Sequence, residues 1–202
     1  MGNLEIFERM AADYDTPERR KYAKLCADEI RSLLKNSKDK TAIDFGCGTG
    51  LVGLELVEDF RKVTFVDSAK NMVACVLEKL AANNINNADA LVLDLEKEEA
   101  EIAPVDYIFM TQVLLHIKEV LPILKKLSQL LNSGGHLIII DFDKNELVSS
   151  DMVHAGFEQN ELSDLLSQLG FDVNESRTFY RGEKIFMGKD ASLFIIDAIL
   201  AE

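Results

Sequence analysis

The stretch IDFGCGTGLVG, residues 43–53, decides the fold, because it places four glycines within eight positions directly after a short apolar run. A glycine cluster between a strand and a helix brings backbone close to a ligand. Two patterns fit. The first three glycines form G-x-G-x-G behind an acid, and the last three form G-x-G-x-x-G, the dinucleotide fingerprint. The residues are Asp44, Gly46, Gly48, Gly50 and Gly53.

Working outward, short apolar runs alternate with helical stretches from residue 41 onward. Strands that are apolar almost throughout are typical of a parallel sheet covered by helices on both faces. Only RGEKIFMGK joins the last two runs, which is too short for a crossover helix, so that pair is expected to be antiparallel. We expect strands at 41–45, 62–67, 90–95, 105–110, 136–143, 171–180 and 190–200, and helices at 4–35 (broken near YDTP), 50–59, 69–82, 118–131 and 158–169.

Length and composition narrow the class of protein. The 202 residues predict a single domain over 1–202, with a helical lead-in at 1–40 and the core at 41–202. No apolar run is long enough to cross a membrane and the N-terminus is acidic, so we expect a cytoplasmic protein without a membrane partner. The formal charge of −13 argues against a nucleic-acid partner, which needs a basic track.

Two acids stand where a sheet of this kind binds ligands, at the carboxyl ends of its strands. Asp67 closes the strand predicted at 62–67, and Asp94 lies at or just beyond the end of the next one. A fixed carboxylate at Asp67 is placed to accept both hydroxyls of a ribose. Asp94 is placed to hold the exocyclic amine of an adenine.

Six segments in this order resemble the small-molecule branch of the class I S-adenosylmethionine-dependent methyltransferases, over about residues 4–200: TAIDFGCGTG, VTFVDSAKNMV, LDLEK, VDYIFMTQVLLHI, LLNSGGHLIIIDFD and ELSDLLSQLGFDV. The resemblance implies an α/β fold, a Rossmann-like seven-stranded mostly parallel sheet with helices on both faces and an antiparallel C-terminal hairpin. It also implies methyl transfer from S-adenosyl-L-methionine to a small-molecule acceptor by in-line displacement. The cofactor-binding residues it implies are Asp44, Gly46, Cys47, Gly48, Gly50, Asp67, Ser68, Met72, Asp94, Leu95 and Thr111.

The choice between the two glycine patterns also has a physical basis. S-adenosylmethionine has no pyrophosphate, so its site needs an acid for the ammonium and no helix N-terminus aimed at phosphate. Asp44 suits that ammonium, and Gly53 then serves close packing of helix and sheet. Two alternatives stay open: a non-catalytic S-adenosylmethionine-binding sensor or partner protein, and an NAD-dependent oxidoreductase.

Few catalytic residues are obligatory for this reaction, because alignment supplies much of the acceleration. An acceptor with a high pKa also needs a base, and we expect the catalytic candidates to be His116, His154 and Tyr14. His136 begins a strand at the opposite end of the sheet, which favours a structural role.

Several neighbours complete the predicted site. The polar connection 142–157 is long enough to be a substrate loop. Residues 110–113 are expected to form the floor near the methyl group. Tyr180, Arg181 and Lys184 are expected to reach the pocket from the last hairpin. Because TQ at 111–112 breaks the set of acids that a metal-dependent site needs, no metal is expected. A homodimer is possible.

Overall fold

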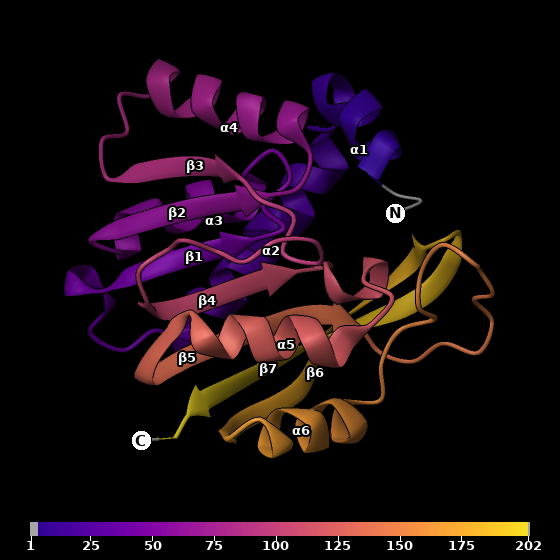
Figure 1. Ribbon diagram of the computed structural model, residues 1–202. Helices are drawn as coiled ribbons and strands as arrows, with labels where there is room; N and C mark the ends of the chain where they lie inside the picture. The colour runs from indigo at the N-terminus through magenta and orange to yellow at the C-terminus, as the bar shows by residue number, and fades with distance from the viewer. Residues whose placement is uncertain (1–3, 202) are drawn as a thin grey trace.

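The computed structural model describes residues 4–201, so the first three residues and the last residue of the predicted domain lie outside the described part. Its centre is a seven-stranded sheet in the order β3-β2-β1-β4-β5-β7-β6 (Figure 1). The first five strands run parallel, and β7 is antiparallel to both β5 and β6. The predicted fold class is therefore confirmed. The strands are β1 (Thr41–Phe45), β2 (Lys62–Asp67), β3 (Ala88–Val92), β4 (Val105–Thr111), β5 (Leu131–Phe142), β6 (Phe171–Phe186) and β7 (Lys189–Leu200).

Several strand boundaries differ from the sequence expectation. β3 ends at Val92; beyond it the Leu93 amide donates to the Asp67 carbonyl at 3.0 Å, and Leu93 and Leu95 are both buried. β5 begins at Leu131, where a register shift in β4 extends the pairing. The last two strands are longer than predicted and meet at a tight turn of two residues with positive φ, Met187 and Gly188.

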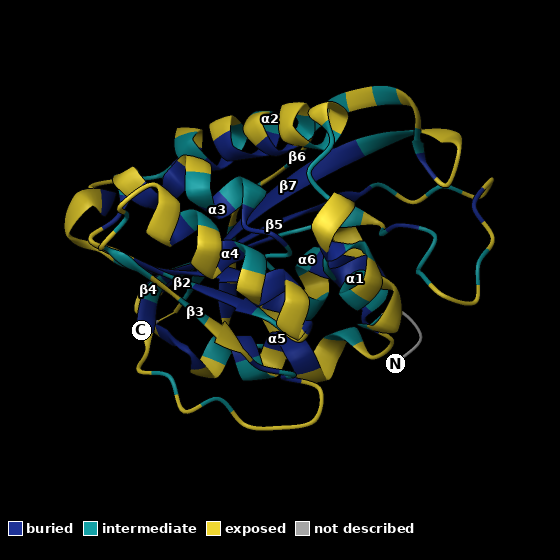
Figure 2. Cartoon of the chain, turned by 90° about the horizontal axis from the view of Figure 1, so that it is seen from above, coloured by how far each residue is buried: buried dark blue, intermediate teal, exposed yellow. Residues whose placement is uncertain are grey.

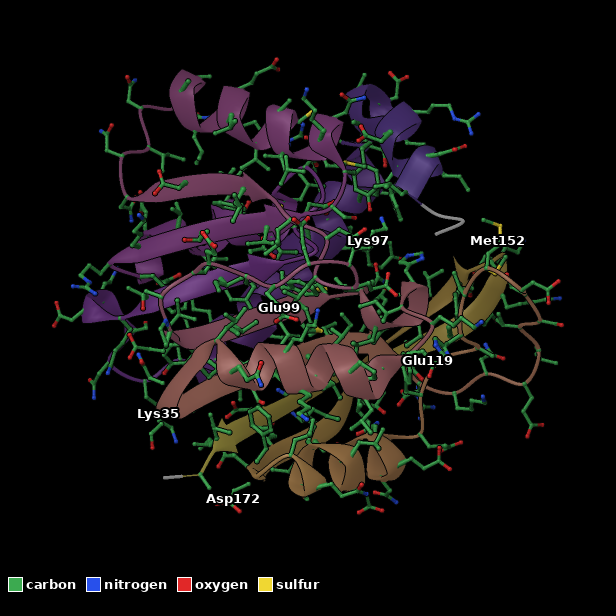
Figure 3. The ribbon with its side chains drawn as sticks, in the orientation of Figure 1. Lys35, Lys97, Glu99, Glu119, Met152 and Asp172 are labelled. Carbon is green, nitrogen blue, oxygen red and sulfur yellow. The ribbon has the colours of Figure 1, made fainter. Side chains whose placement is uncertain are left out.

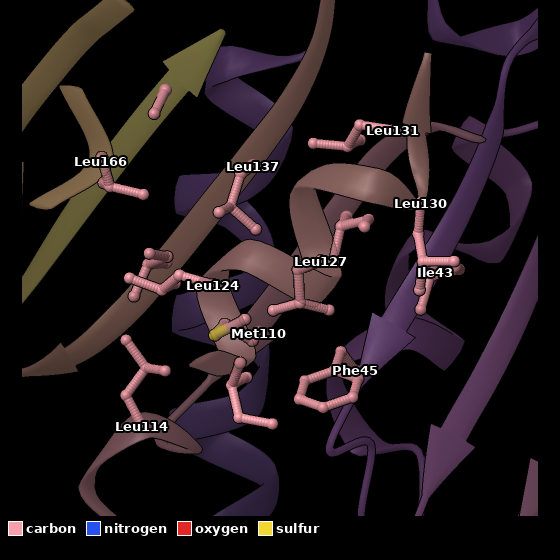
Figure 4. Packing of buried hydrophobic residues seen from close by; sticks show 14 of the residues in the cluster. Ile43, Phe45, Met110, Leu114, Leu124, Leu127, Leu130, Leu131, Leu137 and Leu166 are labelled. Carbon is pink, nitrogen blue, oxygen red and sulfur yellow. The ribbon is translucent and has the colours of Figure 1, made fainter. Parts of the chain in front are cut away.

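Helices cover both faces of the sheet (Figure 1). The buried faces of α2, α3 and α4 pack in one cluster with β1, β2, β4 and β5, and those of α5 and α6 pack in another on the opposite face. Figure 2 shows the buried residues facing inward, and Figure 4 shows Met110 of β4 against Leu124 and Leu127 of α5. The helices are α1 (Leu4–Met10), α2 (Pro17–Leu33), α3 (Leu51–Leu56), α4 (Lys70–Ala82), α5 (Val120–Gln129) and α6 (Gln159–Gln168), with short 3₁₀ turns η1 (Ala11–Asp13), η2 (Ser37–Asp39), η3 (Val57–Asp59) and η4 (Leu114–His116).

The N-terminal segment folds back over the carboxyl ends of the strands. The Glu8 carboxylate accepts the N–H groups of Lys70 and Asn71, at 2.7 and 2.9 Å, and so caps the positive end of α4. Further along, Asp15 accepts from the Thr49 hydroxyl at 2.5 Å and pairs with Lys79 at 2.7 Å. These contacts hold the lead-in against the glycine loop.

The connection 142–157 is tied down along its length. The Lys144 and Asn145 amides donate to the carbonyls of Phe157 and Ala155, and Val148 is buried. Gly156 has φ +83°, and a Cβ there would lie 2.3 Å from the Asp143 carbonyl oxygen. A substrate role for this segment stays a prediction. Within the described residues, no helix is both long enough and apolar enough to cross a membrane.

Candidate active site

The glycine loop leaves β1 in a conformation that side chains resist. Gly46, Gly48 and Gly50 have φ of +67°, +53° and +80°. The amides of Gly46 and Cys47 both donate to the Val66 carbonyl, at 2.8 and 3.0 Å, which binds the loop to the end of β2. A Cβ on Gly46 would lie 2.5 Å from a methyl carbon of Val113. The loop is therefore fixed between the ends of β2 and β4.

Asp44 and Gly53 pack directly against each other behind this loop. Asp44 is buried, and its Oδ2 accepts the Gly53 amide at 3.1 Å. A Cβ on Gly53 would lie 2.4 Å from that oxygen and 2.4 Å from the Phe65 ring, so the predicted packing role of Gly53 is confirmed. Burial raises the pKa of Asp44 to about 8, although the Gly53 hydrogen bond acts to lower it. A nearby cation would favour its ionised form.

Asp67 closes β2 with its carboxylate held from two sides. One oxygen accepts the Gly48 amide at 2.8 Å, and the other accepts the Ala69 amide at 2.8 Å. Burial raises the pKa of Asp67, and these two hydrogen bonds act in the opposite direction. Each oxygen retains a lone pair, so the fixed carboxylate can accept two further donors.

Asp94 lies in the loop beyond β3. Its carboxylate pairs with Lys97, which Figure 3 labels, and accepts the Glu96 amide at 3.2 Å. The neighbouring Leu95 is buried, and its carbonyl accepts from Lys126 at 2.9 Å. The two residues thus present one carboxylate and one apolar side chain at the same place.

The end of β4 carries an unsatisfied polar atom. Among the described residues, the Thr111 hydroxyl oxygen is the one buried side-chain polar atom without a hydrogen-bond partner. The next residue, Gln112, has φ +56°, which is strained for a residue with a Cβ, and its amide donates to the Ile140 carbonyl at 2.7 Å. Orphaned polar groups and backbone strain both concentrate at functional sites.

Two cavities of about 440 Å³ each meet above these strand ends. The first extends toward Asp67, Ser68, Asp94 and Leu95. The second extends behind the glycine loop, to Asp44, Cys47 and the first turns of α2. The residues that line both cavities are Tyr14, Gly46, Gly48, Thr111, Gln112 and Ile185. Their volumes are those of small-molecule sites.

The three histidines have different surroundings. His116 lines the first cavity, stands edge-on to Phe7 at 5.1 Å between ring centroids, and has its pKa lowered by burial to about 4. His154 lines neither cavity; its Nε2 lies 2.8 Å from the Ile117 carbonyl oxygen. His136 lies 2.8 Å from Asp197 and stacks on a tyrosine ring, so its predicted structural role is confirmed.

Tyr14 forms the wall that the two cavities share. The Arg19 guanidinium lies 4.0 Å from its ring centroid and donates to its carbonyl at 2.9 Å. Burial raises the pKa of the Tyr14 phenol, although Arg19 acts to lower it. The hydroxyl therefore stays protonated near neutral pH and can donate a hydrogen bond.

Some expected residues do not line either cavity. Met72 is fully buried beneath the site, and Gly50 caps α3 behind the loop. The prediction that Tyr180, Arg181 and Lys184 reach the pocket is wrong for the two deep cavities. Tyr180 packs on Tyr22, Arg181 lines a separate surface cleft, and Lys184 lines neither cavity. A register irregularity between Gly182 and Phe186, with Lys184 at φ +56°, turns Ile185 inward in their place.

Sequence reasoning missed several contributors, among them Arg19, Thr49 and Ile185. The pattern TPER gave a partial signal, because Thr16 and Pro17 begin α2 and so place Arg19 in its first turn. Nothing in the sequence indicates that this turn faces the glycine loop. Within residues 4–201, no group of three or more potential metal-ligating side chains is gathered.

The sheet order, the glycine loop after β1 and the acid ending β2 together define a Rossmann-like class of fold. The chain belongs to the methyltransferase domain family, whose model matches residues 18–176. It is 28% identical over 157 residues to an uncharacterized methyltransferase of Schizosaccharomyces pombe, covering 68% of this chain and 54% of that protein. It is also 28% identical over 127 residues to a tRNA U34 carboxymethyltransferase of Pasteurella multocida, covering 60% and 39%.

Among solved structures, a SAM-dependent methyltransferase from Aquifex aeolicus superposes with a TM-score of 0.75 at 21% identity, covering 96% of this chain and 98% of that one. At that identity the likeness shows the fold. The chain spans about half of the length of the first of these two curated relatives and less than half of the second. Family and fold therefore leave the acceptor undecided.

Proposed function

We propose that this protein transfers a methyl group from S-adenosyl-L-methionine to a small-molecule acceptor by in-line displacement, in the cytoplasm. The observation that carries the proposal is Thr111, a residue that lines both cavities and whose buried hydroxyl has no hydrogen-bond partner. An ammonium donor placed there would satisfy it. Methyltransferase family membership supports the same cofactor.

The first cavity suits the adenosine part. The Asp67 carboxylate, already held by Gly48 and Ala69, would accept the ribose hydroxyls. Asp94 and Leu95 would hold the adenine by its amine and its face. Ser68 lines the same cavity beside Asp67.

The second cavity suits the amino-acid part. Asp44 and Thr111 would accept from its ammonium, and a bound cation would shift Asp44 toward its ionised form. Arg19, close to the Tyr14 ring, would pair with its carboxylate. Gly46, Cys47 and Gly48 would supply close backbone and Gly50 would shape the loop, whereas Met72 would support the lead-in from below, in one cluster with Ala11 and Ala69.

S-adenosylmethionine supplies, when bound, a methyl group on a sulfonium that is an excellent leaving group. What the chain must add is alignment and exclusion of water, and proximity alone can contribute roughly 7–11 kcal/mol. Tyr14 and His116 both line the first cavity, and we propose that they border the acceptor, Tyr14 as a hydrogen-bond donor and His116 as a neutral ring. For His154 we propose a positioning role, because its ring and amide hold the carbonyls of Ile117 and Leu115.

A small acceptor is supported by the formal charge of −13, which opposes a polyanion. Because one relative is a tRNA U34 carboxymethyltransferase, an RNA acceptor is the first alternative to a small molecule. A non-catalytic S-adenosylmethionine-binding protein is the second alternative, and it predicts cofactor binding without transfer to any acceptor. An NAD-dependent oxidoreductase is disfavoured by the methyltransferase family model, which matches residues 18–176.

Calorimetry with S-adenosylmethionine and S-adenosylhomocysteine tests the proposal, with NADH as the negative control. Both should bind the wild type. Thr111→Val, which keeps the shape and removes the hydroxyl, should weaken binding by about 1–3 kcal/mol, the cost of one unsatisfied buried group. Thr111→Ser is the matched control and should retain most of the affinity. Binding of NADH in place of both compounds would overturn the proposal.

A further inference from the structure

The first cavity is charged at one end only. Its charged lining residues all come from the ends of β2 and β3, and they are Asp67, Asp94, Glu96 and Lys97. The opposite side is built by β4, β5, η4, α5 and β6, and its described lining residues carry no Asp, Glu, Lys or Arg. Beyond the end of β4 they are Gln112, Val113, Leu115, His116, Ile117, Ile123, Phe142 and Ile185, of which only Gln112 and His116 are polar.

His116 does not add a charge to this side. Its ring is largely buried and lies edge-on to Phe7, which comes from α1 and also lines the cavity. Burial holds the pKa of His116 at about 4, so the imidazole is neutral near pH 7. Leu4, one turn before Phe7, extends the apolar cover. The neutral side is thus closed by α1 as well.

We propose that the methyl acceptor is an uncharged, mainly apolar molecule carrying one hydroxyl or thiol, bound on this neutral side of the first cavity. The inference rests on the proposed function, because adenosine would then fill the charged end. An acceptor with a carboxylate or phosphate would lose its hydration here without gaining a cation, which disfavours its binding. Apolar walls favour a hydrocarbon frame instead.

The transfer step balances with groups already named. The lone pair on the acceptor oxygen or sulfur forms the bond to the methyl carbon. The electron pair of the carbon–sulfonium bond returns to sulfur, and the proton of the acceptor is released to solvent. No oxidant, reductant or further reactant is needed.

Three probes with one ring system test the charge preference: 2-naphthol, 2-naphthoate and 2-naphthyl phosphate, each titrated by calorimetry into protein saturated with S-adenosylhomocysteine. We expect 2-naphthol to bind at least about tenfold more tightly than either anion. Equal affinities, tighter binding of an anion, or no binding of 2-naphthol would overturn the inference. Displacement of bound 2-naphthol by tRNA would overturn it in favour of an RNA acceptor.

A pair of variants on one hairpin locates the probe. Ile185→Lys places a cation on the neutral side, whereas Met187→Lys places it at the hairpin turn, where Met187 is 60% exposed and lines neither cavity. Ile185→Lys should weaken 2-naphthol and reverse the preference toward 2-naphthoate, and Met187→Lys should change neither. Identical behaviour of the two variants would contradict the location. Failure of S-adenosylhomocysteine to bind the wild type is a separate outcome that removes the proposed function itself.

Discussion

Replacing Asp67 by alanine tests the centre of the proposed cofactor site. The carboxylate is held by the amides of Gly48 and Ala69 at 2.8 Å each and would accept two ribose hydroxyls. Hydrogen bonds to a charged group contribute about 1.5–3 kcal/mol each. The two lost bonds are not additive, so we expect about 2–4 kcal/mol, a rise in Kd of roughly 30- to 700-fold. Calorimetry with S-adenosylhomocysteine measures it.

Two further variants separate charge from fold. Asp67→Asn keeps the size of the side chain but can accept only one of the two amides, so its Kd should lie between those of wild type and alanine variant. Asp89→Ala removes a 67% exposed carboxylate that pairs with Lys62 on the surface, and it should leave Kd unchanged. The reasoning is refuted if Asp67→Ala, with an unchanged circular dichroism spectrum, binds within about threefold of the wild type.

Three other predictions follow from packing and burial. Gly53→Ala should overpack against Asp44 and destabilise the protein by about 1–3 kcal/mol. The higher helix propensity of alanine offsets up to about 1 kcal/mol of this cost. The Tm should therefore fall by several degrees, and an unchanged Tm would contradict the prediction. Burial raises the pKa of Asp141, in β5, to about 7, so the folded state binds a proton more tightly than the unfolded chain. The free energy of unfolding should therefore fall as pH rises from 3.8 toward 7. Asp141→Asn should flatten this pH dependence in urea unfolding, and the same pH dependence in wild type and variant would argue against it. For His116 the shift is opposite, so its contribution to stability should be lost as pH falls from 6.5 to about 4, and an NMR titration midpoint near 6.5 would count against its burial.

Much of the candidate site was predictable because strand ends impose position. The residues that end β1, β2 and β4 must meet at one edge of a parallel sheet, so Asp67 and Thr111 could be placed from the predicted strand ends, whereas Ser68 followed from the resemblance to the methyltransferases. Asp94 was placed correctly although β3 ends earlier than expected, because the chain leaves the strand in the same direction. Their roles toward a cofactor stay proposals.

The sequence by itself determined the sheet, the direction of its last strands and the glycine loop, because periodicity and connection length are local properties of the chain. Only the tertiary structure decided which side chains enter the cavities. A register irregularity turns Ile185 inward and leaves Arg181 outside, and α2 brings Arg19 over Tyr14. The tertiary structure also places the His154 ring next to a backbone carbonyl and Gly53 against Asp44. The geometry of these contacts depends on how helices, loops and strands pack against one another, which no local pattern records.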